Sequence, residues 1–317
     1  MKWYFILVIV IASLMVLFGI YLLLGAFVIH SFLSKRAIRK IFKHNAAIPN
    51  NPFYNQVDLE WFNDDEVFRI VSIKSFDKKK LNAHYAVNPK PSHKYIIYVH
   101  GWAGSPDEET KVLREIFEKH DFNLLNIEQR AQWNSDIKLC TMGIRESRDL
   151  LSWVDYIIKN DPDAQIVLYG MSMGAGTVSL VNKYDLPSQV KCLIADAGFT
   201  SVYNTFIDSS QMRFGKFLAS IFMTSAYLVL KLFFGLDIKK DSPINALKKC
   251  HLPILFIHGD QDQMVPYSSM AMLASSLPKH IYREMVTFEG TKHGLCAVDN
   301  YPRFYQVIVD FIARENK

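Results

Sequence analysis

Cysteine is scarce in this chain of 317 residues, and the four cysteines, Cys140, Cys192, Cys250 and Cys296, lie far apart. None forms a CxxC pair or stands at ligand spacing from a histidine, which excludes the usual zinc and redox motifs. Two disulfides are possible by number, but a chain of this length can build a core without them. We therefore predict buried free thiols and no metal site.

A strong excess of one charge is also missing, because 36 Lys and Arg face 31 Asp and Glu. The basic residues are scattered, apart from one cluster near the N-terminus, and no basic face carries interleaved aromatic residues. Nucleic acid is therefore not an expected partner. Internal repeats and low-complexity tracts are absent as well.

What the sequence does have is a long apolar N-terminus, with no charged residue from Trp3 to Ile29. A helix needs about 20 such residues to cross a bilayer, whereas the apolar region of a signal peptide has only about 7–15. We predict an uncleaved transmembrane anchor over residues 1–34 and a single-pass protein of the cell membrane. A buried core helix is the alternative, but it would show a polar face.

Basic residues after the anchor bear on its orientation. Lys2 precedes the apolar run, and the basic residues that follow it are Lys35, Arg36, Arg39, Lys40 and Lys43. The positive-inside rule would keep the rest of the chain on the cytoplasmic side, and free thiols agree with that side.

Beyond a basic, then Asn/Pro-rich connector over residues 35–60, short apolar runs alternate with amphipathic segments. The runs of strand length are 67–73, 81–87, 95–99, 123–127, 166–169, 192–195, 254–257 and 285–288. Helical periodicity marks 108–119, 143–159 and 301–314. The alternation predicts an α/β domain over residues 61–317, with a mostly parallel central sheet flanked by helices.

The segment Gly170-Met171-Ser172-Met173-Gly174 has the form G-x-S-x-G and follows a buried strand. A serine in such a strand-to-helix turn is lifted out of the sheet edge, and the glycines let strand and helix approach closely. The turn also directs the Met173 amide to the place where an oxyanion would form. We interpret Ser172 as a nucleophile; a chance serine in a glycine-rich turn does not account for this context.

A second oxyanion donor is expected from the loop after residues 95–99, which reads His100-Gly101-Trp102. Gly101 permits a tight backbone there, and the Trp102 amide is the natural donor. His100 stands before the nucleophile in the chain, so we interpret it as a structural loop residue.

A serine hydroxyl needs a histidine to take its proton, and that histidine needs a carboxylate to orient it. In this kind of fold the chain order is Ser, acid, His. His293, in the loop before the last helix, is the histidine placed to act as base.

Two aspartates compete for the role of the acid, since both Asp260 and Asp262 follow the strand at 254–257. We choose Asp262, because it lies in the turn before Val265-Pro266, where the acid usually sits. Asp196, at the end of another strand, is interpreted as a packing or polar-network residue.

Residues 199–250 interrupt the alternation with apolar helical sequence and no strand. A second transmembrane span is one explanation, but Arg213, Lys216 and Lys231 leave no uncharged stretch of about 18 residues. We predict a helical cap inserted over the site instead.

Together these motifs resemble the α/β-hydrolase superfamily from about Val67 to the end of the chain. Within it, the chain looks similar to bacterial membrane-anchored hydrolases of the Bem46-like and serine-aminopeptidase-like groups. The motifs that carry the resemblance are His100-Gly101-Trp102, the segment Gly170–Gly174, His258-Gly259-x-x-Asp262-x-x-Val265-Pro266 and His293-Gly294. Similar anchored hydrolases are often described as facing outward, so the sequence leaves the side of the membrane open.

One loop departs from the pattern of these relatives. Many of them carry Asp-x-Arg-Gly-x-Gly-x-Ser after the second central strand, whereas this chain has Glu128-Gln129-Arg130-Ala131-Gln132-Trp133-Asn134-Ser135. Because that loop lines the pocket entrance in relatives, their substrate preference does not carry over.

The predicted activity is hydrolysis of a carboxylic ester through an acyl-enzyme, with Ser172, His293 and Asp262 as the triad and no cofactor. A lipid-like or small-molecule substrate with an apolar acyl part suits the apolar cap and the anchor. An amidase or peptidase with the same triad is the alternative, and a non-catalytic membrane-tethered binding protein is a third. A dehalogenase or epoxide hydrolase would need a carboxylate at position 172.

Overall fold

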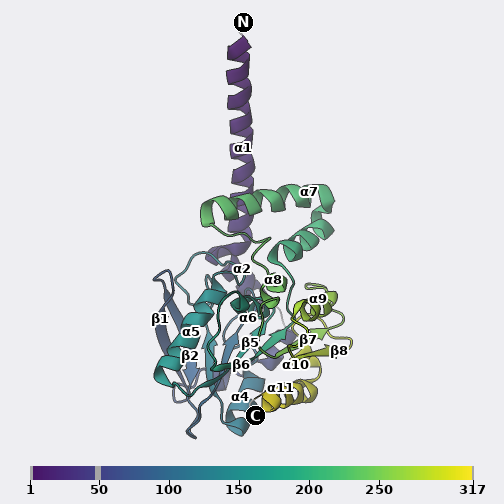
Figure 1. The fold of residues 1–317 in the computed structure, drawn as a ribbon. Coiled ribbons are helices and arrows are strands. Elements are labelled where there is room, and N and C mark those ends of the chain that lie inside the picture. The colour runs from purple at the N-terminus through teal and green to yellow at the C-terminus, as the bar shows by residue number, and fades with distance from the viewer. Residues whose placement is uncertain (1–2, 47–50, 316–317) are drawn as a thin grey trace.

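The computed structural model describes residues 3–46 and 51–315, and a long helix stands out from an α/β domain (Figure 1). The strands are β1 Phe68–Lys74, β2 Lys80–Ala86, β3 Lys94–Val99, β4 Asn123–Ile127, β5 Gln165–Met171, β6 Val190–Asp196, β7 Ile254–Gly259 and β8 Arg283–Phe288. The helices are α1 Trp3–Leu33, α2 Lys35–Ala46, α3 Leu59–Phe62, α4 Thr110–His120, α5 Glu146–Asn160, α6 Met173–Leu180, α7 Val202–Phe234, α8 Pro243–Leu247, α9 Ser268–Ser276, α10 Cys296–Asp299 and α11 Tyr301–Glu315, with 3₁₀ turns η1 Pro52–Gln56 and η2 Val181–Lys183.

The strands form one sheet in the order β1-β2-β4-β3-β5-β6-β7-β8. Neighbours from β4 to β8 are parallel, and only β2 pairs antiparallel, with β1 and β4. Successive strand residues point to opposite faces, so Ile97 and Leu168 pack with α5 and α6 while Ile96 and Val167 pack with α4 and α11. This arrangement confirms the predicted α/β-hydrolase architecture.

Residues 199–250 contain α7 and α8 and, as expected, no strand. The helix α7 is interrupted at Gly215, where the backbone (φ 77°, ψ 162°) is not helical and the chain turns. Gly215 has a positive φ that L side chains rarely adopt, so a glycine suits this position. The four cysteines are free and buried.

Two helices of the described chain are long and apolar enough to cross a membrane, Trp3–Leu33 and Phe214–Phe234. The residues from Trp3 to Phe18 are exposed throughout, whereas Gly25, Ile29 and Leu33 are buried near the base of the helix. The segment expected to be a connector, 35–60, holds α2 and η1; its Ile48-Pro49-Asn50 lies outside the described residues, as does Lys2.

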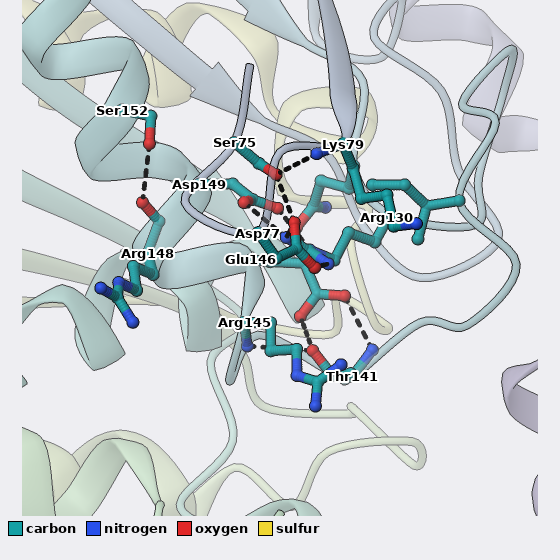
Figure 2. Close-up of polar contacts among 12 residues, drawn as sticks. Ser75, Asp77, Lys79, Arg130, Thr141, Arg145, Glu146, Arg148, Asp149 and Ser152 are labelled. Atoms are coloured by element: carbon teal, nitrogen blue, oxygen red, sulfur yellow. Dashed lines mark hydrogen bonds and ion pairs between the residues drawn. The ribbon is translucent and has the colours of Figure 1, made fainter. Parts of the chain in front are cut away.

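The loop after β4 is held by a buried guanidinium (Figure 2). Arg130 makes paired hydrogen bonds to Asp149 on α5, at 2.5 and 2.8 Å, and to Asp77 in the β1–β2 turn, at 2.8 and 3.0 Å. Burial raises the pKa of Asp149 to about 7 despite these bonds. The arginine of the relatives' loop is thus kept here, and it fixes the loop to two other elements.

We expect Arg130→Met to lower the free energy of unfolding by about 3–5 kcal/mol, because it leaves the Asp149 carboxylate buried without its partner. Urea unfolding at pH 8, where Asp149 is ionised, measures the loss. Arg148→Met is the matched control, because Arg148 is exposed on α5 next to Asp149 and stacks on Phe76. This substitution should lower the free energy of unfolding by less than about 1 kcal/mol. Equal losses in the two variants would contradict the role given to Arg130.

Candidate active site

Ser172 stands in a sharp turn between β5 and α6. Its backbone has φ 54° and ψ −111°, a strained conformation for a residue with a side chain. A Cβ at Gly170 would lie 2.2 Å from the Gly174 carbonyl oxygen, and one at Gly174 would lie 1.8 Å from the Val99 carbonyl oxygen. Both glycines are therefore required by close backbone approach, and the turn presents the hydroxyl at the carboxyl edge of the sheet.

His293 comes from the loop between β8 and α10 and reaches the serine. Its Nε2 lies 2.8 Å from Ser172 Oγ, and its Nδ1 lies 2.6 Å from Asp262 Oδ2. The structure therefore brings the three residues expected to form a triad into one hydrogen-bonded line. This geometry lets Nε2 accept the serine proton while Nδ1 donates to the carboxylate.

Asp262 follows β7, and both oxygens of its carboxylate accept hydrogen bonds. Its Oδ1 accepts the backbone amides of Met264 and Val265, each at 2.8 Å, and its Oδ2 lies 3.0 Å from His258 Nε2. Burial works against ionisation, but the hydrogen bonds from His258 and His293 outweigh it and hold the pKa of the Asp262 carboxyl well below its usual range. The carboxylate is thus charged at any pH at which His293 is to be oriented.

The sequence does not predict a role for His258, although its motif contains it. It is buried at the end of β7, and its Nε2 also lies 3.1 Å from the Val265 carbonyl oxygen, so that nitrogen carries the proton. His258 therefore donates a second hydrogen bond to the Asp262 oxygen that His293 contacts. Its place in the motif with Gly259 was visible, but the sequence did not show which way its ring points.

Asp260 and His100, which were not chosen as catalytic groups, have other hydrogen-bond partners. Asp260 Oδ1 accepts the Gly290 amide at 2.8 Å. His100 bonds through Nδ1 to the Gly101 carbonyl at 2.8 Å and accepts the Gln129 amide through Nε2 at 3.3 Å, and burial lowers its pKa to about 4. A neutral, fully bonded imidazole of this kind is a loop support. Burial raises the pKa of Asp196 to about 7.

The two expected oxyanion donors belong to different loops at the carboxyl edge of the sheet. Met173 is the first residue of α6, so its amide is among those without an acceptor inside the helix. Trp102 lies in the loop after β3, beside Gly101, whose own amide donates to Glu108 Oε2 at 3.0 Å. The Trp102 amide thus follows the end of β3 and the Met173 amide follows the end of β5.

A cavity of about 430 Å³ opens above Ser172 and His293. Its apolar wall consists of Ile41, Phe42, Val57, Trp102, Ala103, Met171 and Met264. Residues 199–250, predicted to form a cap over the site, contribute none of the described residues that line this cavity, whereas α2 contributes Ile41, Phe42 and Asn45. Within the described residues, no group of three or more His, Cys, Asp or Glu could hold a metal ion.

A larger cavity of about 1010 Å³ lies on the other side of α2, toward the base of α1. Phe42 lines both cavities, and its ring meets Trp133 edge to face at 5.8 Å. Phe42 thus lies between the serine site and the larger cavity, which basic residues of α2 also line.

Glu108 lines the serine cavity, and burial raises the pKa of its carboxyl to about 8. It is therefore neutral at pH 7 and ionises as the pH rises through 8. We expect hydrolytic activity to fall several-fold above pH 8, because a carboxylate bonded to Gly101 would repel an oxyanion held by the adjacent Trp102 amide. Glu108→Gln keeps the acceptor and stays neutral, so its pH–rate profile should lack this decline; an unchanged alkaline limb would refute the assignment.

Comparisons with known proteins identify the family of this chain. Residues 129–317 match the model of the prolyl oligopeptidase family, whose members have the α/β-hydrolase fold. The chain belongs to that family. It is therefore a hydrolase by family, and the match contains the elbow serine, Asp262 and His293.

Relatives along most of the chain include protein bem46 of Schizosaccharomyces pombe, 23% identical over 88% of this chain and 87% of its own length. Protein YqkD of Bacillus subtilis is 24% identical over 90% of each chain. Among solved structures, an esterase of Pyrococcus furiosus has a TM-score of 0.62 at 22% identity, over 78% of this chain and 92% of its own. An acylaminoacyl peptidase of Pyrococcus horikoshii has a TM-score of 0.59 at 16% identity, over 80% of this chain but only 42% of its own.

Proposed function

We propose that the protein is a membrane-anchored serine hydrolase that cleaves carboxylic esters with an apolar acyl group. The observation that carries this proposal is the hydrogen-bonded line from Asp262 through His293 to Ser172 at the floor of a cavity with an apolar wall. No metal or organic cofactor is part of the mechanism.

In the proposed reaction, His293 Nε2 takes the Ser172 proton while Oγ attacks the acyl carbon, and the Trp102 and Met173 amides stabilise the oxyanion. His293 then protonates the departing alcohol, and an acyl-enzyme remains. Water, deprotonated by the same nitrogen, attacks this ester, and Ser172 recovers its proton as the acid leaves.

The apolar cavity supports an ester with a fatty acyl part, and the exposed apolar length of α1 supports an anchor that keeps the site near lipid. Cleavage of an amide or peptide bond is the second candidate. It is favoured by membership in a family named for its peptidases, and the same groups would perform both reactions.

The test is covalent labelling of the full chain in detergent by a fluorophosphonate, with mass spectrometry to locate the adduct. We expect the adduct on the peptide that contains Ser172. Turnover of matched p-nitrophenyl esters and p-nitroanilides of C2 to C12 acids then decides between the two reactions. Faster anilide than ester hydrolysis would reject the esterase, and no adduct at Ser172 would reject both.

A further inference from the structure

The half of α7 after Gly215 runs across α1 instead of alongside it (Figure 1). The crossing is close, because a Cβ at Gly25 would lie 2.4 Å from the Ser225 carbonyl oxygen. Tyr21 also donates a hydrogen bond to the Ile221 carbonyl at 3.2 Å. A second span beside α1 would run along it, so this half of α7 does not have the direction of a spanning helix.

The crossing lies at a defined distance along α1. A helix rises about 33 Å from Trp3 to Gly25. The hydrocarbon core of a bilayer has a similar thickness, about 30 Å. The length of α1 that is exposed throughout, Trp3 to Phe18, falls inside this distance. If α1 is the anchor, α7 therefore meets it where α1 leaves the hydrocarbon core.

This half of α7 is apolar on two opposite sides. One side packs on the domain through Ala219, Met223, Ala226 and Leu230. The other side carries Phe217, Ile221, Leu228 and Leu232, at spacings of four, seven and four residues that keep them on one face. Phe217 is 78% exposed and Leu232 is 61% exposed. A helix that is apolar on both sides needs a second apolar environment.

Exposed basic residues follow directly after α1. The helix α2, which begins two residues after α1 ends, contains no acidic residue, and its exposed basic residues are Arg36, Arg39, Lys40 and Lys43. Its apolar side chains Ile38, Ile41 and Phe42 turn toward the domain. Each such cation close to an anionic membrane surface contributes about 1 kcal/mol of attraction.

We propose that residues 216–234 of α7 lie in the plane of the membrane. The outer face, Phe217, Ile221, Leu228 and Leu232, is seated among the acyl chains of the leaflet that α1 leaves, and the basic side of α2 rests on its anionic headgroups. Helices of this kind sink their apolar face about 5–10 Å into the headgroup boundary. The inference rests on the proposed anchor and adds a second, in-plane contact to it.

Nitroxide labels on the full chain test this seating in vesicles of seven parts phosphatidylcholine to three parts phosphatidylglycerol. The four native thiols are buried, so Phe217→Cys, Leu232→Cys, Phe18→Cys and Met272→Cys each add one reactive site. Met272, an exposed apolar residue on α9, is the matched control. We expect Phe217 and Leu232 to be accessible to oxygen and protected from a water-soluble nickel chelate, at a depth shallower than Phe18, and Met272 to show the reverse.

Each outcome of the labelling is decisive. If Phe18 is deep while Phe217 and Leu232 behave like Met272, the in-plane contact is wrong and the anchor holds. If they are as deep as Phe18, α7 spans the bilayer and the inference is equally wrong. If Phe18 itself is aqueous, the proposed anchor fails.

Charge reversal tests the lipid class independently. We expect Arg39→Glu with Lys40→Glu to reduce by several-fold the phosphatidylglycerol retained around the full chain in polymer-excised discs. Lys111→Glu with Lys119→Glu is the matched control, because α4 lies at the opposite end of the molecule from α1 (Figure 1). Equal retention in the two double variants would overturn the headgroup contact of α2.

Discussion

Ser172→Ala is expected to lower kcat for a p-nitrophenyl acyl ester by about 10⁶-fold, the loss seen when a triad nucleophile is removed. The hydroxyl is the only group of this residue that His293 Nε2 meets, at 2.8 Å, and alanine leaves the base with nothing to deprotonate. The side chain is small and stands at a turn, so the fold should persist. Initial rates at saturating ester, with circular dichroism as a check on folding, measure the effect.

A matched serine separates this loss from a general disturbance of the cavity. Ser105 lines the same cavity and bonds to Asp107. Ser105→Ala should keep fluorophosphonate labelling and most of the turnover, whereas Ser172→Ala should lose both. Residual turnover above a few per cent in Ser172→Ala would mean that another group is the nucleophile.

Asp262→Asn should lower kcat by about 10⁴-fold, because an amide cannot hold the histidine tautomer that a carboxylate holds. Four donors converge on this carboxylate, namely His293, His258 and the backbone amides of Met264 and Val265. Asparagine would present its NH₂ or its oxygen to groups that all donate, so His293 loses its orientation. The measurement is kcat between pH 6 and 9 on the same ester.

Asp260→Asn is the control, since both aspartates follow the same strand. Its carboxylate accepts the Gly290 amide, a bond that the asparagine oxygen can replace. We expect the kcat of Asp260→Asn to stay within about threefold of that of the unchanged protein. A surface substitution of this kind changes the free energy of unfolding by about 0.5 kcal/mol or less. A larger loss for Asp260→Asn than for Asp262→Asn would exchange their roles.

The strands and the order of the motifs could be predicted from sequence because they follow from local rules. A run such as 95–99 is apolar at every position, as a strand buried on both faces must be. A G-x-S-x-G turn after such a strand has few conformations open to it. The line of Ser172, His293 and Asp262 arises because parallel strands bring their carboxyl ends to one edge of the sheet.

The surroundings of the site could not be predicted in the same way. The α2 sequence shows basic and apolar residues at helical spacing, but periodicity does not tell what an apolar face packs against. Phe42 lines the serine cavity, although more than a hundred residues separate it from the turn at Ser172 in the sequence. The break at Gly215 is likewise a single glycine in apolar sequence, and only its φ of 77° shows that the helix turns there.

The position of α2 means that the residues lining the serine cavity begin in the helix that directly follows α1. A shortened protein that starts at Lys35 keeps the inner side of α2 against the cavity, whereas one that starts at residue 61 loses Ile41, Phe42 and Asn45 from the wall. The two should differ in acyl-chain selectivity while sharing the same reacting groups. We therefore expect the acyl-chain selectivity of this hydrolase to depend partly on α2, the helix that connects α1 to the rest of the chain.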